Sequence, residues 1–338
     1  MGQNYGSDRH GLICGYRFCA GGIGTPVTLE EAHAWLKDAQ PSTPRGEGDF
    51  VWLHFNLGDA AAEAWMRSHL PVVPEFFAAL HEGSRSTRIE DADDTLVAVV
   101  NDVAYSFAFD PGEIETLWLN VSPHLAVSAR LHPLRSIDVL RQAVKDGLRF
   151  ASSVAFLNRL LHDQGDVLVR IVRQATTLVD TVEDQLLVGR LKHKRAELGQ
   201  LRRVLVRLQR LLAPEPGALF RLLRRPPPWV PVDDLEELRQ ATEEFSLVLR
   251  DAADLQERIR LLQEEIAAQV GEQTNQSVYT LTVVTVLALP INLAAGLLGM
   301  NVGGIPLAEN SHGFWWIVAL VIGFTALAGW WAMRKKDD

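Results

Sequence analysis

The sequence lacks most of the marks of a secreted protein or an enzyme. Its 338 residues include only two cysteines, Cys14 and Cys19, too few for a disulfide framework, and a Cys-x4-Cys pair is a poor zinc motif without two further ligands. Glycine-rich phosphate loops, Gly-x-Ser-x-Gly elbows and paired metal motifs are absent. The N-terminus has no basic region followed by an apolar core, so we predict no secretory signal. These absences favour a reducing compartment and argue against an enzyme.

Two long stretches near the C-terminus lack charge. Residues 278–298 and 314–333 contain no Asp, Glu, Lys or Arg, and each can cross about 30 Å of hydrocarbon as a helix. The loop 299–313 between them has no Lys or Arg, whereas the tail 334–338 begins Arg-Lys-Lys. By the positive-inside rule, both termini are cytoplasmic and the loop faces the other side. The sequence therefore predicts a two-helix transmembrane hairpin, bracketed by interfacial tryptophans at Trp315, Trp316, Trp330 and Trp331.

The first 150 residues alternate strand and helix patterns. Thr28 and Glu31 form a capping-box pattern that begins a helix, and several strand connections are too short for anything but antiparallel hairpins. We predict strands at 11–18, 51–55, 95–100, 104–109, 115–120 and 124–129, and helices at 28–39, 60–70, 75–81 and 136–146. Residues 1–150 are therefore expected to form a cytoplasmic α+β domain.

The pattern from 151 to 230 is helical and then basic. Eleven Lys and Arg residues lie between 190 and 225, against two glutamates. A proline run at 226–228 stops the helices, and we predict a new helix from Asp233, as its N-cap, to Leu298. Its cytoplasmic part, 233–277, is acidic, so we expect it to pair with the basic helices in the same chain or another copy, and we expect no nucleic-acid partner.

The predicted long helix carries a coiled-coil seam. Its apolar residues from Leu235 to Val270 recur at three- and four-residue steps over several heptads. A single two-span hairpin cannot enclose a pore, so transport would require several copies. We expect this seam to assemble them.

A polar stripe continues along the first apolar span and its approach. Its members lie at steps close to multiples of 3.5 and are Asn275, Thr282, Thr285, Leu289 and Asn292. In lipid, such a stripe should face protein or water. It is consistent either with a water-filled pathway or with helix–helix packing, and both interpretations stay open. Just beyond it, Asn301 is placed to present a ring of amide oxygens to a cation in an assembly of copies.

The tripeptide Gly299-Met300-Asn301 stands between two spans at the extreme C-terminus and after a very long helix. In this position it resembles the signature of the CorA family of divalent-cation transporters. The resemblance covers nearly the whole chain, through segments 88–96 and 117–130. More narrowly, segments 299–315 and 130–135 are similar to the ZntB-type zinc transporters.

This resemblance implies a homopentamer in the bacterial inner membrane. Its expected parts are a cytoplasmic funnel of α/β/α sandwiches, five long stalk helices that line the pore, and the second spans outside them. Gly299, Met300 and Asn301 would form the outer selectivity loop, and Asn292, Thr285 and Asn275 fall on the pore-lining face. The magnesium branch usually follows the tripeptide with Met-Pro-Glu-Leu. Here residues 303–308 lack the acid, which favours the zinc branch.

The expected function is therefore zinc uptake, with Mg²⁺, Co²⁺, Ni²⁺ or Cd²⁺ as other cargoes and no tightly bound cofactor. Neither span contains His or Cys, so we expect weak passage of a hydrated ion at Asn301. Glu309 would attract cations at the outer mouth or be an ordinary loop residue. Proton coupling stays open: the resemblance to ZntB-type transporters allows it, whereas the spans contain no carboxylate or histidine to relay a proton. The alternatives are a magnesium or cobalt channel and, from a different class, a membrane-anchored sensor or scaffold without transport.

Overall fold

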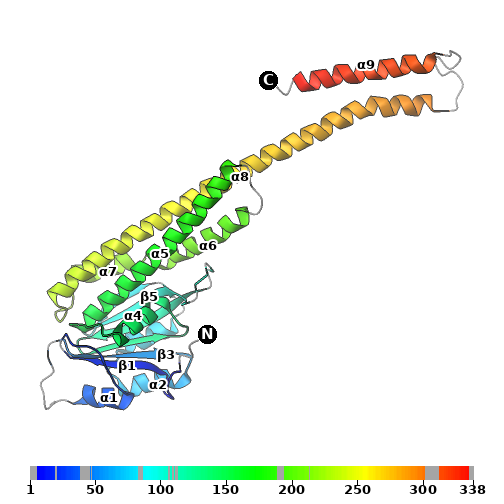
Figure 1. The fold of residues 1–338 in the computed structure, drawn as a ribbon. Coiled ribbons are helices and arrows are strands. Elements are labelled where there is room, and N and C mark those ends of the chain that lie inside the picture. Colours follow the sequence, from blue (N-terminus) through cyan, green and yellow to red (C-terminus); the bar gives the residue numbers. More distant parts are fainter. Residues whose placement is uncertain are drawn as a thin grey trace. The chain divides into compact units, whose positions relative to one another are not determined.

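The computed structural model describes residues 6–19, 21–38, 46, 48–82, 87–105, 107–108, 110, 113–188, 194–212, 214–300 and 312–334. The chain divides into two compact units, Met1–Leu262 and Gln263–Asp338. One long helix, α8 (Val232–Leu298), begins in the first unit and ends in the second. Figure 1 shows the elements of both units.

The first unit contains a mixed sheet with the strand order β2-β1-β3-β7-β6-β5-β4. Its strands are β1 Leu12–Phe18, β2 Thr25–Pro26, β3 Phe50–Asn56, β4 Arg88–Ala92, β5 Thr95–Val103, β6 Ile114–Ser122 and β7 Leu125–Arg130. The predicted antiparallel hairpins are confirmed from β4 to β7. β3 and β7 are parallel, with Val51 opposite Leu125, which is possible because two helices and three strands separate them in sequence.

Helices cover both faces of this sheet (Figure 1). One face carries α1 Leu29–Lys37, α2 Ala60–His69 and α3 Pro74–His81, and the other carries α4 Arg135–Lys145, α5 Ser153–Leu187 and α7 Pro214–Arg224. The alternation within β3 explains the two layers, since Val51 and Leu53 belong to one core and Trp52 to the other. The predicted α/β/α sandwich is confirmed.

Local side-chain bonds fix several helix starts. The predicted capping box is present, with Thr28 Oγ1 accepting from the Glu31 backbone N–H and Glu31 Oε2 accepting from the Thr28 N–H. The α4 helix begins where Oδ2 of buried Asp102 accepts from the Ser136 N–H at 2.7 Å. Burial raises the pKa of the Asp102 carboxyl to about 6.

Two predictions at segment boundaries were wrong. The strand predicted at 95–100 is confirmed within β5, which runs to Val103 and pairs with β6 from Leu96 to Val103, but no separate strand is present in the described residues of 104–109. Within the described part of 104–109, Ala104 makes only an isolated bridge, and Phe107 is partly buried against a cluster from α5, α6 (Lys194–Leu212) and α8. The α8 helix begins at Val232, so Asp233 lies in its first turn rather than at the N-cap.

The coiled-coil seam on α8 is already buried within one chain. Leu238, Phe245, Ala252 and Ile259 are seven residues apart and 0 to 4% exposed. Phe245 belongs to an apolar cluster with residues of α5 and α6. The expectation that this seam assembles copies is therefore wrong for these four residues, since their side chains are already buried within one chain.

Charge pairing supports the same packing of α8 on α5. Arg258 of α8 donates from Nε to Glu183 Oε1 and from a terminal nitrogen to Asp180 Oδ1, both at 2.7 Å. In this pairing the cation is on α8 and the carboxylates are on α5. The α5 helix lies outside the basic stretch 190–225, so the predicted pairing of that stretch with the acidic α8 stays a prediction.

Candidate ion pathway

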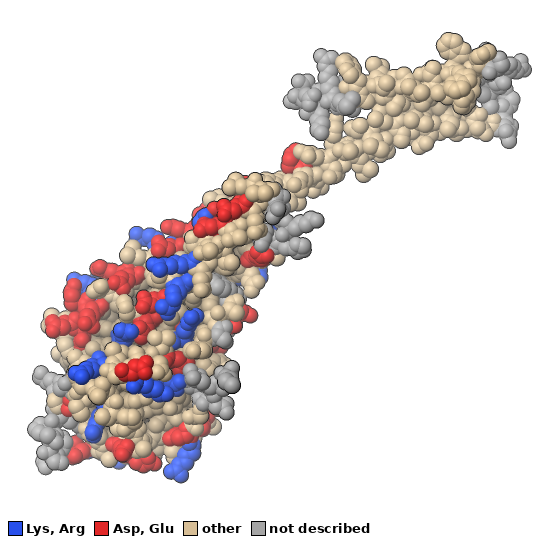
Figure 2. Space-filling model, viewed as in Figure 1, with Lys and Arg blue, Asp and Glu red and all other residues tan. Residues whose placement is uncertain are grey.

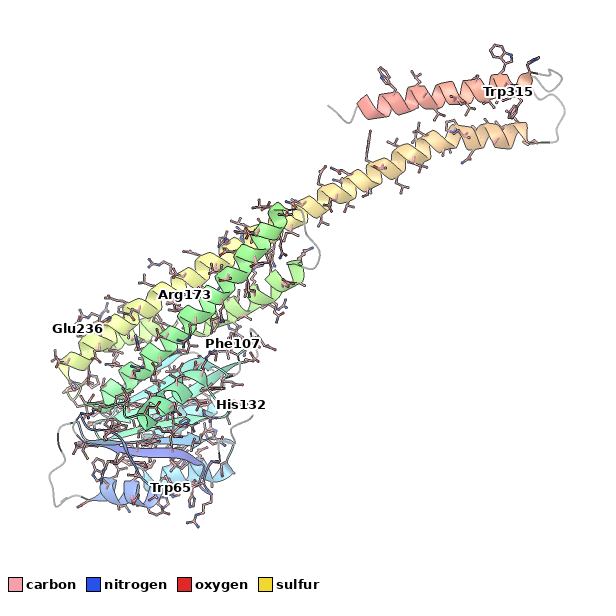
Figure 3. All side chains as sticks on the ribbon, in the orientation of Figure 1. Trp65, Phe107, His132, Arg173, Glu236 and Trp315 are labelled. Carbon is pink, nitrogen blue, oxygen red and sulfur yellow. The ribbon has the colours of Figure 1, made fainter. Side chains whose placement is uncertain are left out.

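The second unit consists of the end of α8 and of α9 (Gly313–Arg334). Among the described residues, α8 and α9 are the two helices long and apolar enough to cross a membrane by length and composition. Residues 278–298 of α8 and 313–330 of α9 contain no Lys, Arg, Asp or Glu, and these parts of the two helices are tan in Figure 2. Trp315 lies in the first turn of α9 (Figure 3) and is 68% exposed. An exposed indole at the end of an apolar helix suits a membrane interface.

The hydroxyl groups at the start of the apolar part of α8 are satisfied by its own backbone. Each donates to the carbonyl four residues earlier at 2.8 to 2.9 Å, and the residues are Thr274, Ser277, Thr280, Thr282 and Thr285. A hydroxyl that donates a hydrogen bond still has lone pairs that can accept one. These side chains therefore have no unsatisfied donor, and their oxygen atoms can accept hydrogen bonds from groups outside the helix.

The stripe predicted from the sequence lies on one face of α8. On an ideal helix of 3.6 residues per turn, the spacing of its five members from Asn275 to Asn292 spans an arc of about 100°. All five are exposed in the single chain, and Leu289 is 66% exposed. Two hydroxyls, two amides and one apolar side chain therefore form a surface without charge.

The tripeptide Gly299-Met300-Asn301 is only partly within the described residues. The α8 helix ends at Leu298, and Gly299 follows with its N–H donating to the Ala295 carbonyl at 3.0 Å. A Cβ atom on Gly299 would lie 2.9 Å from that same carbonyl oxygen, closer than real Cβ contacts. Met300 is 50% exposed. Asn301 and Glu309 lie outside the described residues, so their predicted roles stay predictions.

The first unit contains a buried polar network around His54. Arg130 Nε donates to His54 Nε2 at 3.1 Å, and His54 Nδ1 lies 2.8 Å from Ser128 Oγ, which also accepts from Trp52 Nε1. Burial and the nearby Arg130 hold the pKa of His54 well below its ordinary value. Because Nε2 accepts the hydrogen bond from Arg130 and the ring is neutral, His54 has a structural role in the core. Within the described ranges, no three His, Cys, Asp or Glu side chains are grouped to hold a metal.

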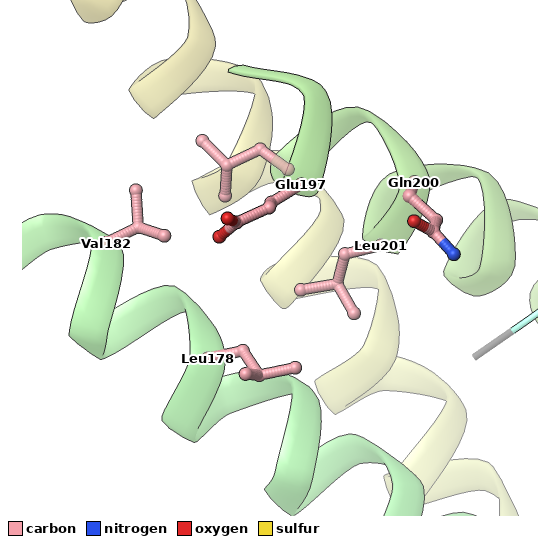
Figure 4. A pocket seen from close by; sticks show the side chains of 6 residues that line it. Leu178, Val182, Glu197, Gln200 and Leu201 are labelled. Carbon is pink, nitrogen blue, oxygen red and sulfur yellow. The ribbon is translucent and has the colours of Figure 1, made fainter. Parts of the chain in front are cut away.

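Two hollows lie beside α5, and neither was predicted. An apolar one of about 230 Å³ is formed by Leu178 and Val182 of α5 with Leu198 and Leu201 of α6 (Figure 4). A polar one of about 290 Å³ lies between α5 and α8 and includes His162. Its polar residues lie four apart on α5 and seven apart on α8, so each set shares one side of its helix, but this spacing does not indicate that the two helices pack together.

Comparison with known proteins agrees with this architecture. The family model described as "CorA-like Mg2+ transporter protein" matches residues 47–335. The chain is 29% identical over 334 residues to the divalent cation transporter CmaX of Pseudomonas aeruginosa, covering 97% of each chain. It is 24% identical over 311 residues to the zinc transport protein ZntB of Pectobacterium atrosepticum, covering 90% of this chain and 95% of the relative.

Solved structures show the same fold. The structure of full-length CmaX gives a TM-score of 0.78 at 27% identity, covering 97% of this chain and 98% of CmaX. The complete CorA magnesium transporter of Methanocaldococcus jannaschii gives 0.74 at 18% identity, covering 94% and 96%. At 18% identity, the similarity to the CorA structure shows a shared fold only.

Proposed function

The chain belongs to the family of CorA-like Mg2+ transporter proteins, and from that premise we propose that it carries divalent metal cations across the inner membrane, zinc above all, through a pore formed by five copies. The observation that carries this proposal is the uncharged stripe on α8. Its two hydroxyls donate their hydrogen bonds to backbone carbonyls of α8. Their lone pairs are therefore left to accept hydrogen bonds from groups outside the helix. An acceptor-rich, uncharged lining suits a cation that keeps its water.

Weak binding is an advantage for such a pathway. An ion must leave as readily as it enters, and His or Cys ligands would hold zinc too tightly. Neither span contains them. A ring of Asn301 amides at the outer end, with Gly299 and Met300 beside it, would select divalent cations, while Thr282, Thr285 and Asn292 would support the hydrated ion below.

Zinc is favoured over magnesium by two observations. Residues 303–308 lack the acid that usually follows the tripeptide in the magnesium branch, and a relative covering most of the chain is named a zinc transport protein. A magnesium or cobalt channel is the second candidate, because the available pore ligands are the oxygen donors that Mg²⁺ prefers. Both candidates place the termini in the cytoplasm and the loop outside.

The test is zinc flux into proteoliposomes that contain the purified oligomer. Asn301→Ala should reduce flux strongly, whereas the matched control Asn310→Ala, in the same loop, should not. Competition by Mg²⁺, Co²⁺, Ni²⁺ and Cd²⁺ ranks the cargoes, and an imposed pH gradient tests proton coupling.

Three results would contradict parts of the proposal. Normal flux in Asn301→Ala would remove the role of the amide ring. Magnesium flux without zinc flux would select the second candidate. An intact oligomer that transports no ion would favour a membrane-anchored sensor or scaffold.

A further inference from the structure

The polar hollow between α5 and α8 is lined wholly by residues of the first unit. It measures about 290 Å³, and its polar lining consists of Asn158, Arg159, His162, Glu237, Gln240 and Glu244. Asn158 and His162 are four residues apart on α5, while Glu237 and Glu244 are seven apart on α8. These spacings place each pair on one side of its helix, so two helices present their donors to the same cavity.

One buried side chain in this cavity lacks a partner for its oxygen. Asn158 is 4% exposed, and its Nδ2 donates to the Asp234 carbonyl at 2.8 Å. Its Oδ1 is buried without a hydrogen bond. A buried acceptor without a donor costs about 1–3 kcal/mol, so this atom favours a ligand that brings a cation or a bound water.

The charge of the cavity also favours a cation. His162 Nδ1 lies 3.7 Å from Glu244 Oε2, and His162 Nε2 lies 3.9 Å from Asp166 Oδ2. Arg159, the one Arg in the lining, lies 3.0 Å from Asp163 on its own helix. Among the described residues, no ion pair joins Glu237 or Glu244 to Lys or Arg, so two carboxylates face the cavity without such a counter-ion.

We propose that this cavity binds one divalent cation, with Zn²⁺ as the best fit, through His162 Nδ1 and Glu244 Oε2 as direct ligands. Two zinc ligands at about 2.0–2.1 Å from a tetrahedral ion are about 3.3 Å apart, so their present separation of 3.7 Å requires only a small side-chain movement. Water fills the other positions and donates to Glu237 and to Asn158 Oδ1. This assignment explains the orphaned amide oxygen, and the mixed nitrogen and oxygen donors suit zinc better than magnesium.

The proposed ion would tie α5 to α8 within one chain. A ligand that binds only the folded state raises its stability, so zinc should protect this helix pair from opening. The inference does not depend on transport, because it concerns donors in the first unit alone.

The experiment measures zinc binding to the purified full-length protein by equilibrium dialysis, together with thermal unfolding. His162→Ala and Glu244→Gln should each weaken one zinc site per chain by about tenfold or more and remove the zinc-dependent rise in unfolding temperature. Both side chains are about half exposed, so both variants should fold. His132→Ala is the matched control, because His132 Nε2 also lies 3.9 Å from a glutamate oxygen, on Glu115, but does not line this cavity.

Wild-type zinc binding in both cavity variants would overturn the proposal, as would an equal loss in His132→Ala. Asn301→Ala keeps the two proposals apart, because it should bind zinc at the cavity normally whatever its flux. If Asn301→Ala loses flux but binds zinc normally in the cavity, the residue acts in the pore only. If the wild-type protein transports zinc but has no zinc site in the cavity, the cavity proposal is wrong and the transport proposal stands.

Discussion

Replacing Phe245 with alanine should destabilise the fold of each chain, whereas replacing Leu247, two residues further along α8, should not. Phe245 is 3% exposed and belongs to the cluster shared with α5 and α6, while Leu247 is 57% exposed. A phenylalanine buries at least about 150 Å², which at about 25 cal/mol per Å² is worth about 4 kcal/mol. Measured Phe→Ala changes in protein cores, about 3–5 kcal/mol, agree.

This loss is large beside the usual stability of a domain, about 5–15 kcal/mol. For a unit of this size, each kcal/mol lowers the melting temperature by roughly 2–4 °C, so Phe245→Ala should melt roughly 8–16 °C earlier. The assay is thermal unfolding of the detergent-solubilised protein, with hydrogen exchange to locate the loosened helices. Exchange should increase in α5 and α6 as well as in α8.

The comparison also tests which contacts the seam makes. If the seam joined copies, Phe245→Ala would dissociate the oligomer and leave the unfolding of each chain nearly unchanged. That result, or equal effects of Phe245→Ala and Leu247→Ala on unfolding, would refute the burial argument.

Two further predictions concern a buried carboxyl and the stripe. Because burial raises the pKa of Asp102 to about 6, above its unfolded value of about 4, the folded state holds this proton more tightly. The free energy of unfolding should therefore fall by up to about 3 kcal/mol as the pH rises from about 4 to about 6; a slope that persists in Asp102→Asn would contradict this. Thr285→Val keeps the shape of the side chain but removes its acceptor, so zinc flux should fall by about tenfold with the oligomer intact. Thr325→Val is its control, since that α9 hydroxyl also bonds the carbonyl four residues back, and equal losses of flux would argue against a lining role for Thr285.

Most of the sandwich could be predicted from local sequence. Capping residues, alternation and proline positions located the first helices and five of the strands, because these signals act over a few residues. The error at residues 104–109 has a long-range cause. The length of β5 is set by its hydrogen-bonded pairing with β6, the next strand in the sequence. Local strand propensity carries no information about this pairing.

The partner of the α8 seam could not be read from the sequence either. A heptad pattern shows that one face will be buried, but it is the same whether α5 and α6 or another copy covers it. The stripe on α8 was predictable since it depends on helical spacing alone. The cavity around His162 was not, because it requires knowing that α5 lies beside α8.

The parallel pairing of β3 with β7 has a consequence for the order of folding during synthesis. Strands β4 to β7 are joined by antiparallel pairings between neighbours in sequence, so they close short loops and should form early. The β1–β3 pair can join this part of the sheet only after β7 has been made, since β3 pairs with β7, with Val51 opposite Leu125. We expect β1 and β3 to join the edge of a preformed β4–β7 meander. The ribosome makes the last strand long before Val232, so the sheet can close before the apolar helices exist.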